Sequence, residues 1–273
     1  MRELERDPNF TARDSATQSR AAAPLPPIAI VGAGRVGTAI YRAAVAAGLE
    51  VELATRDDAE AKAARAEIAL LCVPDAAIAE ACAAIPGPPS GPCLVGHTSG
   101  ATGVEALESA RARGAEVFSM HPLQTIPDGD AELAGAPCAI AASDPAAAGV
   151  AGRLAAALGM RPFDLPESSR GAYHAAAAIA SNFLVTLEES AVEVLRRAGI
   201  DEPRALLGPL VLGSAVNWSE RGRNALTGPI ARGDEATVER HLDALETLYP
   251  ELLDAYRALA ERTRALASEE APA

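Results

Sequence analysis

Three glycines near the start of the chain have the spacing of a phosphate-binding turn. The apolar run at 28–31 leads directly into Gly32-x-Gly34-x-x-Gly37, and a helix-forming segment follows at 38–47. In such a strand–turn–helix, the first glycine permits a sharp turn, the second lets the backbone approach a pyrophosphate, and the third lets helix and strand pack closely. Phosphate oxygens would accept hydrogen bonds from unpaired N–H groups at the positive end of the helix. The pattern predicts a dinucleotide site formed by Gly32, Gly34, Arg35, Val36 and Gly37.

The end of the second predicted strand indicates which dinucleotide is bound. In NAD-binding proteins, an acidic residue about 20 positions beyond the glycines holds the ribose hydroxyls. Here the strand ends Ala54-Thr55-Arg56 without an acid, and Arg56 could form a bidentate pair with a 2′-phosphate. The alternative is a solvated Arg56 paired with Asp57 or Asp58. We therefore predict NADP in preference to NAD. The predicted cofactor site is completed by Thr55, Arg56, Val73 and Pro74.

Three further motifs follow predicted strands: Val73-Pro74-Asp75, His97-Thr98-Ser99-Gly100 and His121-Pro122-Leu123-Gln124-Thr125. Ligands of open α/β sheets bind at the carboxyl ends of the strands, so these motifs are expected at one edge. Each motif alone could simply shape a loop. Together they predict a substrate site, in which Ser99 donates to a carboxylate or carbonyl oxygen and Gly100 leaves room for close approach. His121 could orient the substrate or relay a proton.

The second half of the chain offers three more candidates. His174, Ala178 and Asn182 lie on one face of a predicted helix, with the small Ala178 between the two polar residues. The pair is either a satisfied core histidine capped by Asn182, or a proton donor with an orienting amide. Arg232 lies in a Gly-rich loop and could bind a substrate carboxylate, or pin the next helix by pairing with Asp234 or Glu235.

The sequence pattern predicts an N-terminal part of alternating strands and helices and a C-terminal part of helices alone. Strands alternate with alanine-rich helical segments up to about residue 166, and only helices follow. We predict an α/β fold, an N-terminal Rossmann doubly wound, mostly parallel sheet followed by an all-helical C-terminal domain. The predicted domains are a disordered tail at 1–24, a dinucleotide-binding domain at 25–166 and a helical substrate and dimerisation domain at 167–273. The predicted strands are 28–31, 49–54, 67–73, 93–96, 115–120, 137–142 and 161–165, and the main C-terminal helices are 169–198, 203–218 and 235–249.

Composition excludes several classes of function. The 273 residues carry a formal net charge of −13, which argues against nucleic acid or an anionic membrane as the main partner. No apolar run approaches the roughly 20 residues of a membrane-spanning helix. The four cysteines lie mostly in apolar runs without a CxxC pair, so we expect buried thiols in the cytoplasm and no metal site.

Five of these segments together resemble one bacterial family: G-A-G-R-V-G, H-T-S-G-A, H-P-L-Q-T, A-Y-H and L-T-G-P-I-A-R-G-D. It comprises Rossmann-like proteins with a C-terminal domain of unknown function 2520, and the resemblance covers about residues 27–266. The family is similar to ketopantoate reductases, β-hydroxyacid dehydrogenases and pyrroline-carboxylate reductases, and its helical domain is similar to the C-terminal domain of 6-phosphogluconate dehydrogenase. The resemblance implies an NADP-linked enzyme and a homodimer built through the helical domain.

The chain departs from these relatives at the proton donor. Ketopantoate reductases and β-hydroxyacid dehydrogenases place a lysine on the first long helix of the second domain, whereas the one lysine here is Lys62, in the cofactor domain. His174 occupies the comparable place, and its ordinary pKa near 6.5 suits proton transfer close to neutral pH. The H-P-L motif is similar to that of prephenate dehydrogenases, which keeps His121 as a rival donor.

The leading hypothesis is an NADP-dependent oxidoreductase that reduces a small 2-oxo acid or related carbonyl, with ketopantoate as the first substrate to test. His174 or His121 would protonate the product, Asn182 and Ser99 would orient the substrate, and Arg232 would hold its carboxylate. A cyclic imine reductase and a non-catalytic NADP-binding sensor are the alternatives.

Overall fold

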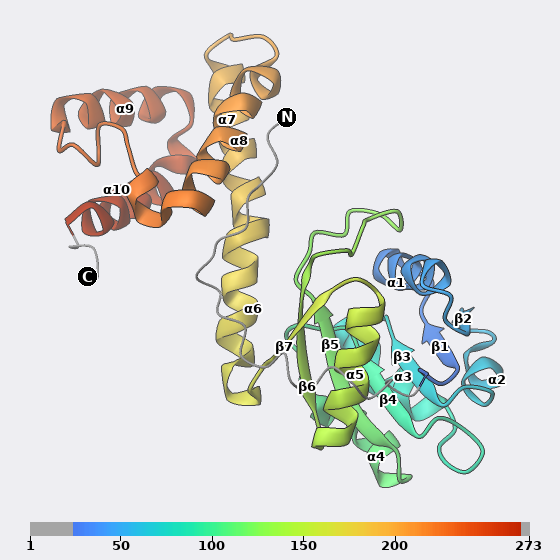
Figure 1. Ribbon diagram of the computed structural model, residues 1–273. Helices are drawn as coiled ribbons and strands as arrows, with labels where there is room; N and C mark the ends of the chain where they lie inside the picture. Colours follow the sequence, from blue (N-terminus) through green and yellow to red (C-terminus); the bar gives the residue numbers. More distant parts are fainter. Residues whose placement is uncertain (1–23, 269–273) are drawn as a thin grey trace. The chain divides into compact units, whose positions relative to one another are not determined.

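The computed structural model describes residues 24–268, so the predicted tail lies outside the described residues apart from Pro24. The chain divides into two compact units, Met1–His174 and Ala175–Ala273. The first contains the sheet and the second is helical, as the sequence predicts (Figure 1). The predicted domain boundary near residue 166 stays a prediction. The last strand ends at Asp164, and the division between the units falls after the fifth residue of the following helix.

A seven-stranded sheet forms the first unit, in the order β2-β1-β3-β4-β5-β6-β7. All neighbouring pairs are parallel except β5 and β6, which are antiparallel. The chain leaves β1 toward β2 and returns to β3 on the other side of β1, so the direction of winding reverses between β1 and β3. The strands are β1 (Ile28–Val31), β2 (Val51–Ala54), β3 (Ile68–Leu71), β4 (Leu94–His97), β5 (Glu116–Pro122), β6 (Pro137–Ala142) and β7 (Arg161–Asp164).

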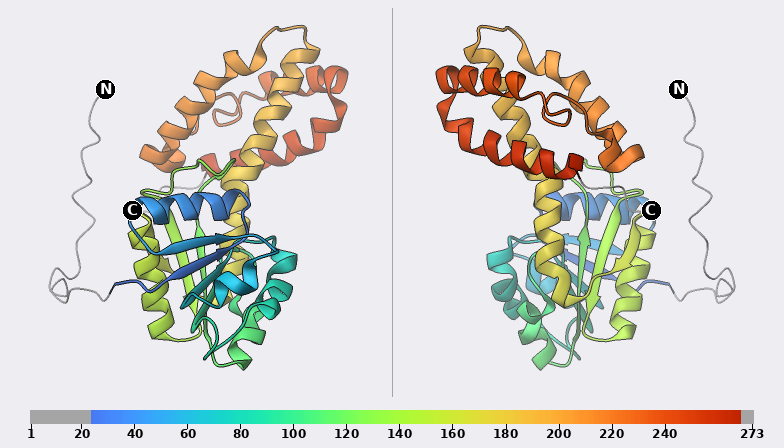
Figure 2. Two further views of the ribbon diagram at one scale, coloured as in Figure 1. Left: turned by 90° about the vertical axis from the view of Figure 1, so that its right-hand side faces the viewer. Right: turned by 90° about the vertical axis from the view of Figure 1, so that its left-hand side faces the viewer.

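Helices cover both faces of this sheet, as Figure 2 shows from two sides. In β1 and β3, alternate side chains pack in opposite directions because successive residues of a strand point to opposite faces. Ile30 and Leu70 join the core under α1 and α5, whereas Val31 and Leu71 join the core under α2, α3 and α4. Burial on both faces explains why these strands are continuous apolar runs. The covering helices are α1 (Arg35–Ala46), α2 (Ala59–Ala63), α3 (Ile78–Ala84), α4 (Glu108–Ala112) and α5 (Pro145–Ala157).

The helical region begins with α6 (Arg170–Ala178) and continues through α7 (Leu184–Arg197), α8 (Pro203–Arg221), α9 (Glu235–Leu248) and α10 (Leu253–Ser268). The predicted cap at Asp234 is confirmed, because its carboxylate accepts from the Thr237 amide at 3.1 Å. Two helical predictions need correction. The helix predicted at 169–198 contains a π-helical segment, Ile179–Phe183, and α8 extends past Trp218 to Arg221.

Cysteine burial also needs one correction. Cys72, Cys82 and Cys138 are buried as expected, but Cys93 is exposed because it lies just before β4, at the end of a Pro/Gly-rich loop. Within residues 24–268, no helix is long and apolar enough to cross a membrane.

Candidate functional site

The predicted dinucleotide turn lies between β1 and α1, and its three glycines have different structural roles. Gly32 has φ +117°, a conformation that other residues rarely adopt. A Cβ at Gly37 would overlap the Gly32 carbonyl oxygen, so this glycine is required for helix and strand to pack. Gly34 is different, because no atom lies within 4 Å of the position that its Cβ would take. Packing does not require a glycine there, whereas a pyrophosphate approaching the backbone would.

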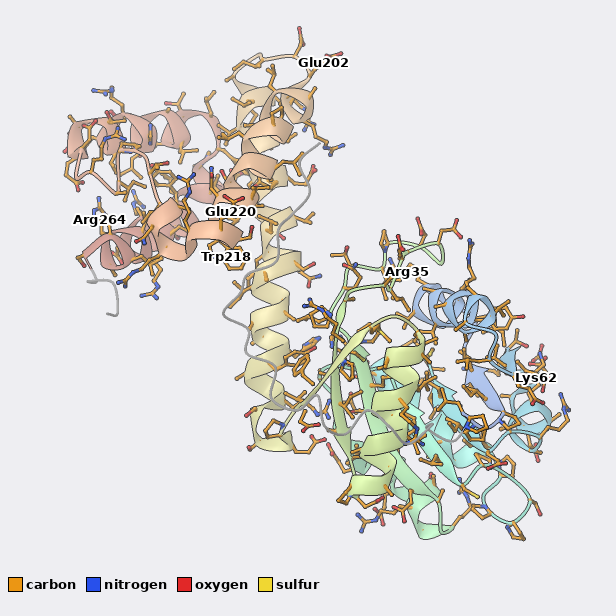
Figure 3. All side chains as sticks on the ribbon, in the orientation of Figure 1. Arg35, Lys62, Glu202, Trp218, Glu220 and Arg264 are labelled. Atoms are coloured by element: carbon orange, nitrogen blue, oxygen red, sulfur yellow. The ribbon has the colours of Figure 1, made fainter. Side chains whose placement is uncertain are left out.

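The amino end of α1 is open for an anion. Gly34 is the N-cap residue and supplies no side-chain cap, and the first turn contains no acidic residue. The Thr38 amide donates to the Gly34 carbonyl in the first helical hydrogen bond, so the amides of residues 35–37 precede the bonded part of the helix. Arg35 is exposed at this end (Figure 3), whereas Val36 packs partly against the core and can contribute mainly its backbone N–H.

A cavity of about 310 Å³ opens beside this turn, at the carboxyl ends of β1, β2 and β3. It lies where the winding of the sheet reverses, which is the usual ligand position in open α/β sheets. The cavity brings together five of the predicted cofactor residues, and alanines of α2 and α3 form much of its other wall. Those five residues are Gly32, Thr55, Arg56, Val73 and Pro74.

The contacts near Arg56 remove one of the two acids that were expected as its partners. Arg56 is exposed and lines the cavity. Asp58, one of its two expected partners, pairs instead with Lys62 at 2.6 Å and accepts from the Thr55 amide at 2.7 Å. The hydrogen bond from Lys62 holds the pKa of Asp58 below its ordinary value. Asp58 is therefore committed to shaping the β2–α2 turn, which leaves Arg56 beside the cavity.

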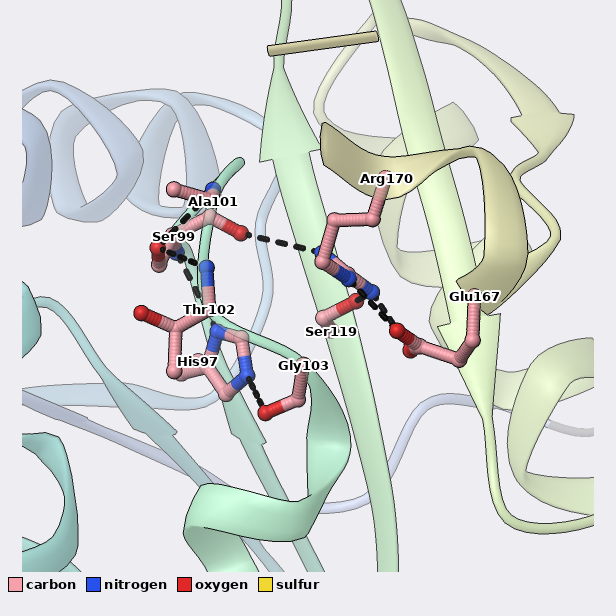
Figure 4. Close-up of polar contacts among 8 residues, drawn as sticks. All are labelled: His97, Ser99, Ala101, Thr102, Gly103, Ser119, Glu167 and Arg170. Carbon is pink, nitrogen blue, oxygen red and sulfur yellow. Dashed lines mark hydrogen bonds and ion pairs between the residues drawn. The ribbon is translucent and has the colours of Figure 1, made fainter. Parts of the chain in front are cut away.

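His97 ends β4 and Ser99 lies in the loop that follows, and Figure 4 shows how both are held. His97 is fully buried, accepts from the Ser99 amide at Nδ1 over 3.2 Å, and bonds the Gly103 carbonyl through Nε2 over 3.1 Å. Because a carbonyl only accepts, Nε2 carries the proton and the ring is neutral. Burial lowers the pKa of His97, in agreement with this state. His97 therefore shapes the loop.

Ser99 is also largely buried, and its hydroxyl oxygen accepts from the amides of Ala101 and Thr102 at 3.2 and 2.9 Å. These bonds close a tight turn of the kind that serine hydroxyls often form. The oxygen is engaged, but the hydroxyl proton can still donate. The structure thus gives Ser99 a loop-shaping role, and its predicted contact with substrate stays a prediction.

Arg170, which the sequence analysis did not single out, connects this loop to the start of α6 (Figure 4). Its side chain is buried and donates to Ser119 Oγ at 2.8 Å, to both oxygens of Glu167 at 2.7 Å, and to the Ser99 carbonyl in a long contact of 3.5 Å. The bonds from Arg170 keep the pKa of Glu167 below its ordinary value. Arg170 therefore fixes the β4 loop, β5 and the first turn of α6 to one another.

The first turns of α6 bring two imidazoles together over Gly100. Tyr173 Oη lies 2.6 Å from Nδ1 of His121, which stands near the end of β5. The rings of His121 and His174 meet edge to face with centroids 6.1 Å apart. A Cβ on Gly100 would lie 2.8 Å from His121 Nε2 and 2.9 Å from His174 Cδ2. Three residues that the sequence analysis named separately, His121, His174 and Gly100, therefore lie together within the first unit, at the same sheet edge as the cavity.

Burial sets the protonation state of His121. Burial, followed by the neighbouring His174 and Arg170, lowers the pKa of His121 to about 4. Burial also raises the pKa of Tyr173 to about 12. Near neutral pH, His121 is therefore an uncharged imidazole and Tyr173 an intact phenol.

The remaining predicted residues lie in the second unit. Asn182 is exposed within the π-helical segment, a type of turn often found at functional sites. Arg232 is exposed in the loop before α9, and its charge helps to lower the pKa of Asp234, after the Thr237 hydrogen bonds and the charge of Arg240. The proposed contacts of Asn182 and Arg232 with substrate stay predictions.

Sequence reasoning missed Arg170, Glu167 and the role of Tyr173. Glu167 and Arg170 are three residues apart at the predicted start of a helix, a spacing at which such side chains meet, and this was a usable signal. Tyr173 directly precedes His174, but no sequence pattern could pair it with His121, 52 residues earlier.

Comparison with known proteins supports the two-part organisation. The sequence matches the "Rossmann-like domain" over residues 51–122 and the "Domain of unknown function (DUF2520)" over residues 136–263. No protein of curated function matches the sequence.

Solved structures share the fold over most of the chain. A Bacteroides fragilis protein proposed to be an NADP oxidoreductase is 23% identical with a TM-score of 0.75, and covers 88% of this chain and 98% of its own. A Thermotoga maritima protein is 24% identical with a TM-score of 0.69 and the same coverage. Pyrroline carboxylate reductase of Plasmodium falciparum, solved with NADP bound, is 15% identical with a TM-score of 0.58, covering 89% of this chain and 98% of its own.

Proposed function

We propose that this chain, which joins a Rossmann-like domain to a DUF2520 domain, is an NADP-dependent oxidoreductase that reduces a small 2-oxo acid or a related carbonyl compound. One observation carries the proposal. A glycine turn of the dinucleotide-binding type and a cavity of about 310 Å³ lie at the same edge of the sheet as two imidazoles that pack against one glycine. Binding and proton-transfer groups at one edge are what a reductase needs.

The residues present fit NADP. The amides of residues 35–37 and the open space at Gly34 suit the pyrophosphate, and Arg56 suits a 2′-phosphate beside the cavity. Val73 and Pro74 line the apolar part of the cavity. When bound, NADPH would supply a hydride to the carbonyl carbon of the substrate. The protein must then bind the substrate and deliver one proton to its oxygen.

His121 and His174 are the groups available for that proton, and both imidazoles pack against Gly100 at the carboxyl edge of the sheet. The Ser99 hydroxyl, next to Gly100 in the chain, keeps a proton that it can donate. The carboxylate of a 2-oxo acid requires a cation, for which Arg232 is the candidate in the second unit.

Reduction of a cyclic imine is the second candidate, because pyrroline carboxylate reductase shares the fold and because His121 is uncharged near neutral pH. A protonated imine needs no strong acid, since its nitrogen already carries the proton. A non-catalytic NADP sensor is less favoured, because it would need no imidazoles gathered over Gly100.

The first experiment separates binding from folding. Gly34→Asp places a carboxylate at an N-cap position where it is well tolerated and where no atom lies within 4 Å of its Cβ. We expect unchanged thermal stability and at least a 30-fold loss in NADPH affinity by fluorescence titration, because the new charge opposes the pyrophosphate. Gly152→Asp, another open glycine with the same charge change, should bind normally. If wild-type protein shows no saturable NADPH binding, the proposal fails.

The second experiment identifies the reaction. NADPH oxidation is followed with ketopantoate and with pyrroline-5-carboxylate in parallel. Turnover of ketopantoate alone supports carbonyl reduction, and turnover of the imine alone supports the second candidate. Tight NADPH binding with neither turnover, across a panel of small 2-oxo acids and imines, would favour the sensor.

We also propose that the helical unit forms a homodimer. In the described residues, α8 exposes several large apolar side chains, including Leu210, Leu212 and Trp218, each more than half exposed. Soluble monomers rarely leave this much apolar surface in water. Figure 3 labels Trp218 and Glu220 on this helix. Trp218→Asp should convert a dimer to a monomer by light scattering, whereas Glu220→Gln should not. A wild-type protein that is monomeric at micromolar concentration would refute the dimer.

A further inference from the structure

His121 and Tyr173 form a hydrogen-bonded pair in which both side chains can donate or accept a proton. The two rings meet edge to face, with centroids 5.5 Å apart and an interplanar angle of 87°. Tyr173 belongs to the first turns of α6 and His121 to β5, so the pair joins helix to sheet. In the described part of the chain, His121 Nδ1 is the one hydrogen-bond partner of the Tyr173 hydroxyl, at 2.6 Å.

The direction of this hydrogen bond follows from counting protons. A phenol carries one proton, and a neutral imidazole carries one on either Nδ1 or Nε2. If Nδ1 donated to Tyr173 Oη, the phenolic proton would need another acceptor in a half-buried place. If the phenol donates to Nδ1, one bond satisfies both groups, and the imidazole proton resides on Nε2. Buried polar groups are normally paired, so the second arrangement is favoured.

Nε2 of His121 packs against Gly100 at the carboxyl edge of the sheet, next to His174. A Cβ on Gly100 would lie only 2.8 Å from this nitrogen and 2.9 Å from His174 Cδ2, so the absence of a side chain at residue 100 lets both imidazoles lie against the backbone. A carbonyl oxygen bound at this edge of the sheet would meet the Nε2–H as a donor. Behind that donor stands the phenol of Tyr173, in contact through the other ring nitrogen.

We infer that Tyr173 and His121 form a two-residue proton relay to the carbonyl oxygen of the substrate, an inference that rests on the proposed carbonyl reduction. As the carbonyl carbon gains a hydride, its oxygen gains the electron pair of the C=O π bond and takes the Nε2 proton. Nδ1 takes the phenolic proton of Tyr173. A proton from water then reaches Nε2, and the Nδ1 proton returns to the phenolate. The net change is one proton moved from water to product.

The groups around His121 agree with a relay that begins from a neutral imidazole. Burial is the main influence that lowers the pKa of His121, and His174, Arg170 and His97 act in the same direction while Asp75 opposes them. The pKa of Tyr173 is raised to about 12, so the phenol keeps its proton until a stronger base draws on it. A developing alkoxide is such a base, and the relay delivers a proton without an imidazolium.

The tautomer is tested without any substrate, by nitrogen-15 NMR of the histidine rings in the full-length protein. We expect wild-type His121 to carry its proton on Nε2 and to accept at Nδ1 at pH 7. Tyr173→Phe should change the Nδ1 signal and mix the tautomers. Tyr256→Phe is the matched control, because it removes the same hydroxyl from the His241–Tyr256 pair, whose atoms lie 2.7 Å apart. A protonated Nδ1 in wild type, or an unchanged spectrum in Tyr173→Phe, would overturn the relay.

The kinetic test uses NADPH and ketopantoate. Tyr173→Phe should lower kcat by about 100-fold, within the usual range for loss of general acid catalysis, and leave the Kd for NADPH unchanged. Its remaining rate should fall as the pH rises, because the proton must then come from the medium. Tyr256→Phe should keep the wild-type kcat and pH profile. Wild-type kcat and pH profile in Tyr173→Phe would overturn the relay, whereas absence of turnover in wild type refutes ketopantoate reduction and leaves the NMR result to decide the tautomer.

Discussion

The neutral, buried imidazole of His121 has a measurable consequence for stability. Its pKa is about 4 in the folded chain and is near 6.5 once unfolded. Between these values the unfolded state binds more protons than the folded state, so acidification favours unfolding. The stability that neutral His121 contributes is complete above about pH 6.5 and is lost as the pH falls toward 4. At the low-pH limit, a pKa difference of 2.5 corresponds to about 3 kcal/mol.

At pH 5 nearly all unfolded chains carry a protonated residue 121, whereas about a tenth of folded chains do, which costs about 2 kcal/mol relative to pH 8. His121→Gln removes the titration and keeps a polar side chain. We therefore expect the variant to lose about 2 kcal/mol less than wild type between pH 8 and pH 5. The buried His97, whose pKa is also lowered, contributes equally to both proteins and cancels in the difference.

Urea unfolding provides the assay, and NMR signals of Ile30 and Ile68 report on the sheet-bearing unit alone, since both lie in its core. Each protein is measured at pH 8, 6.5 and 5. If both lose the same free energy of unfolding over this range, His121 titrates alike in the folded and unfolded chain. The assignment of a neutral buried imidazole, and the relay built on it, would then be wrong.

Three other predictions follow from the same structure. Arg56→Ala should weaken NADPH binding by about tenfold or more and should spare NADH, because charged hydrogen bonds contribute roughly 1.5–3 kcal/mol. Equal losses of affinity for the two cofactors in titrations would mean that Arg56 is merely solvated. Arg65→Ala is the control, because Arg65 pairs with Glu52. Gly37→Ala should prevent stable folding, since its Cβ would overlap a backbone oxygen, and a wild-type melting temperature would contradict the packing. Arg170→Met should lower the free energy of unfolding of the first unit by about 2 kcal/mol in urea, because buried Ser119 loses its hydrogen-bond donor while half-exposed Glu167 regains water. A change below about 0.5 kcal/mol would mean that the hydrogen bonds of Arg170 contribute little to stability.

The strands of the sheet were largely predictable because the residue pattern of each strand lies within a few consecutive positions of the sequence. A strand buried on both faces must be apolar along its length, so the runs around Ile30 and Leu70 are visible in one sequence. Glycine spacing is equally local, and it predicted the turn at Gly32 that now lines the cavity with Arg56. Boundaries were less accurate, as at β3, where the predicted 67–73 shortened to Ile68–Leu71 because the flanking residues pair outside the regular ladder.

The sequence by itself therefore determined the two-part fold, the glycine turn between β1 and α1, and the sheet edge at which His121 and Gly100 would lie. Only the tertiary structure decided that His97 is a loop-shaping residue, that Arg170 clamps three segments, and that Tyr173 is the partner of His121. The physical reason is that a strand's pattern depends on neighbours two residues away, whereas a hydrogen bond across 52 residues depends on how a helix packs against the sheet. The charge of a histidine likewise depends on the burial that this packing creates.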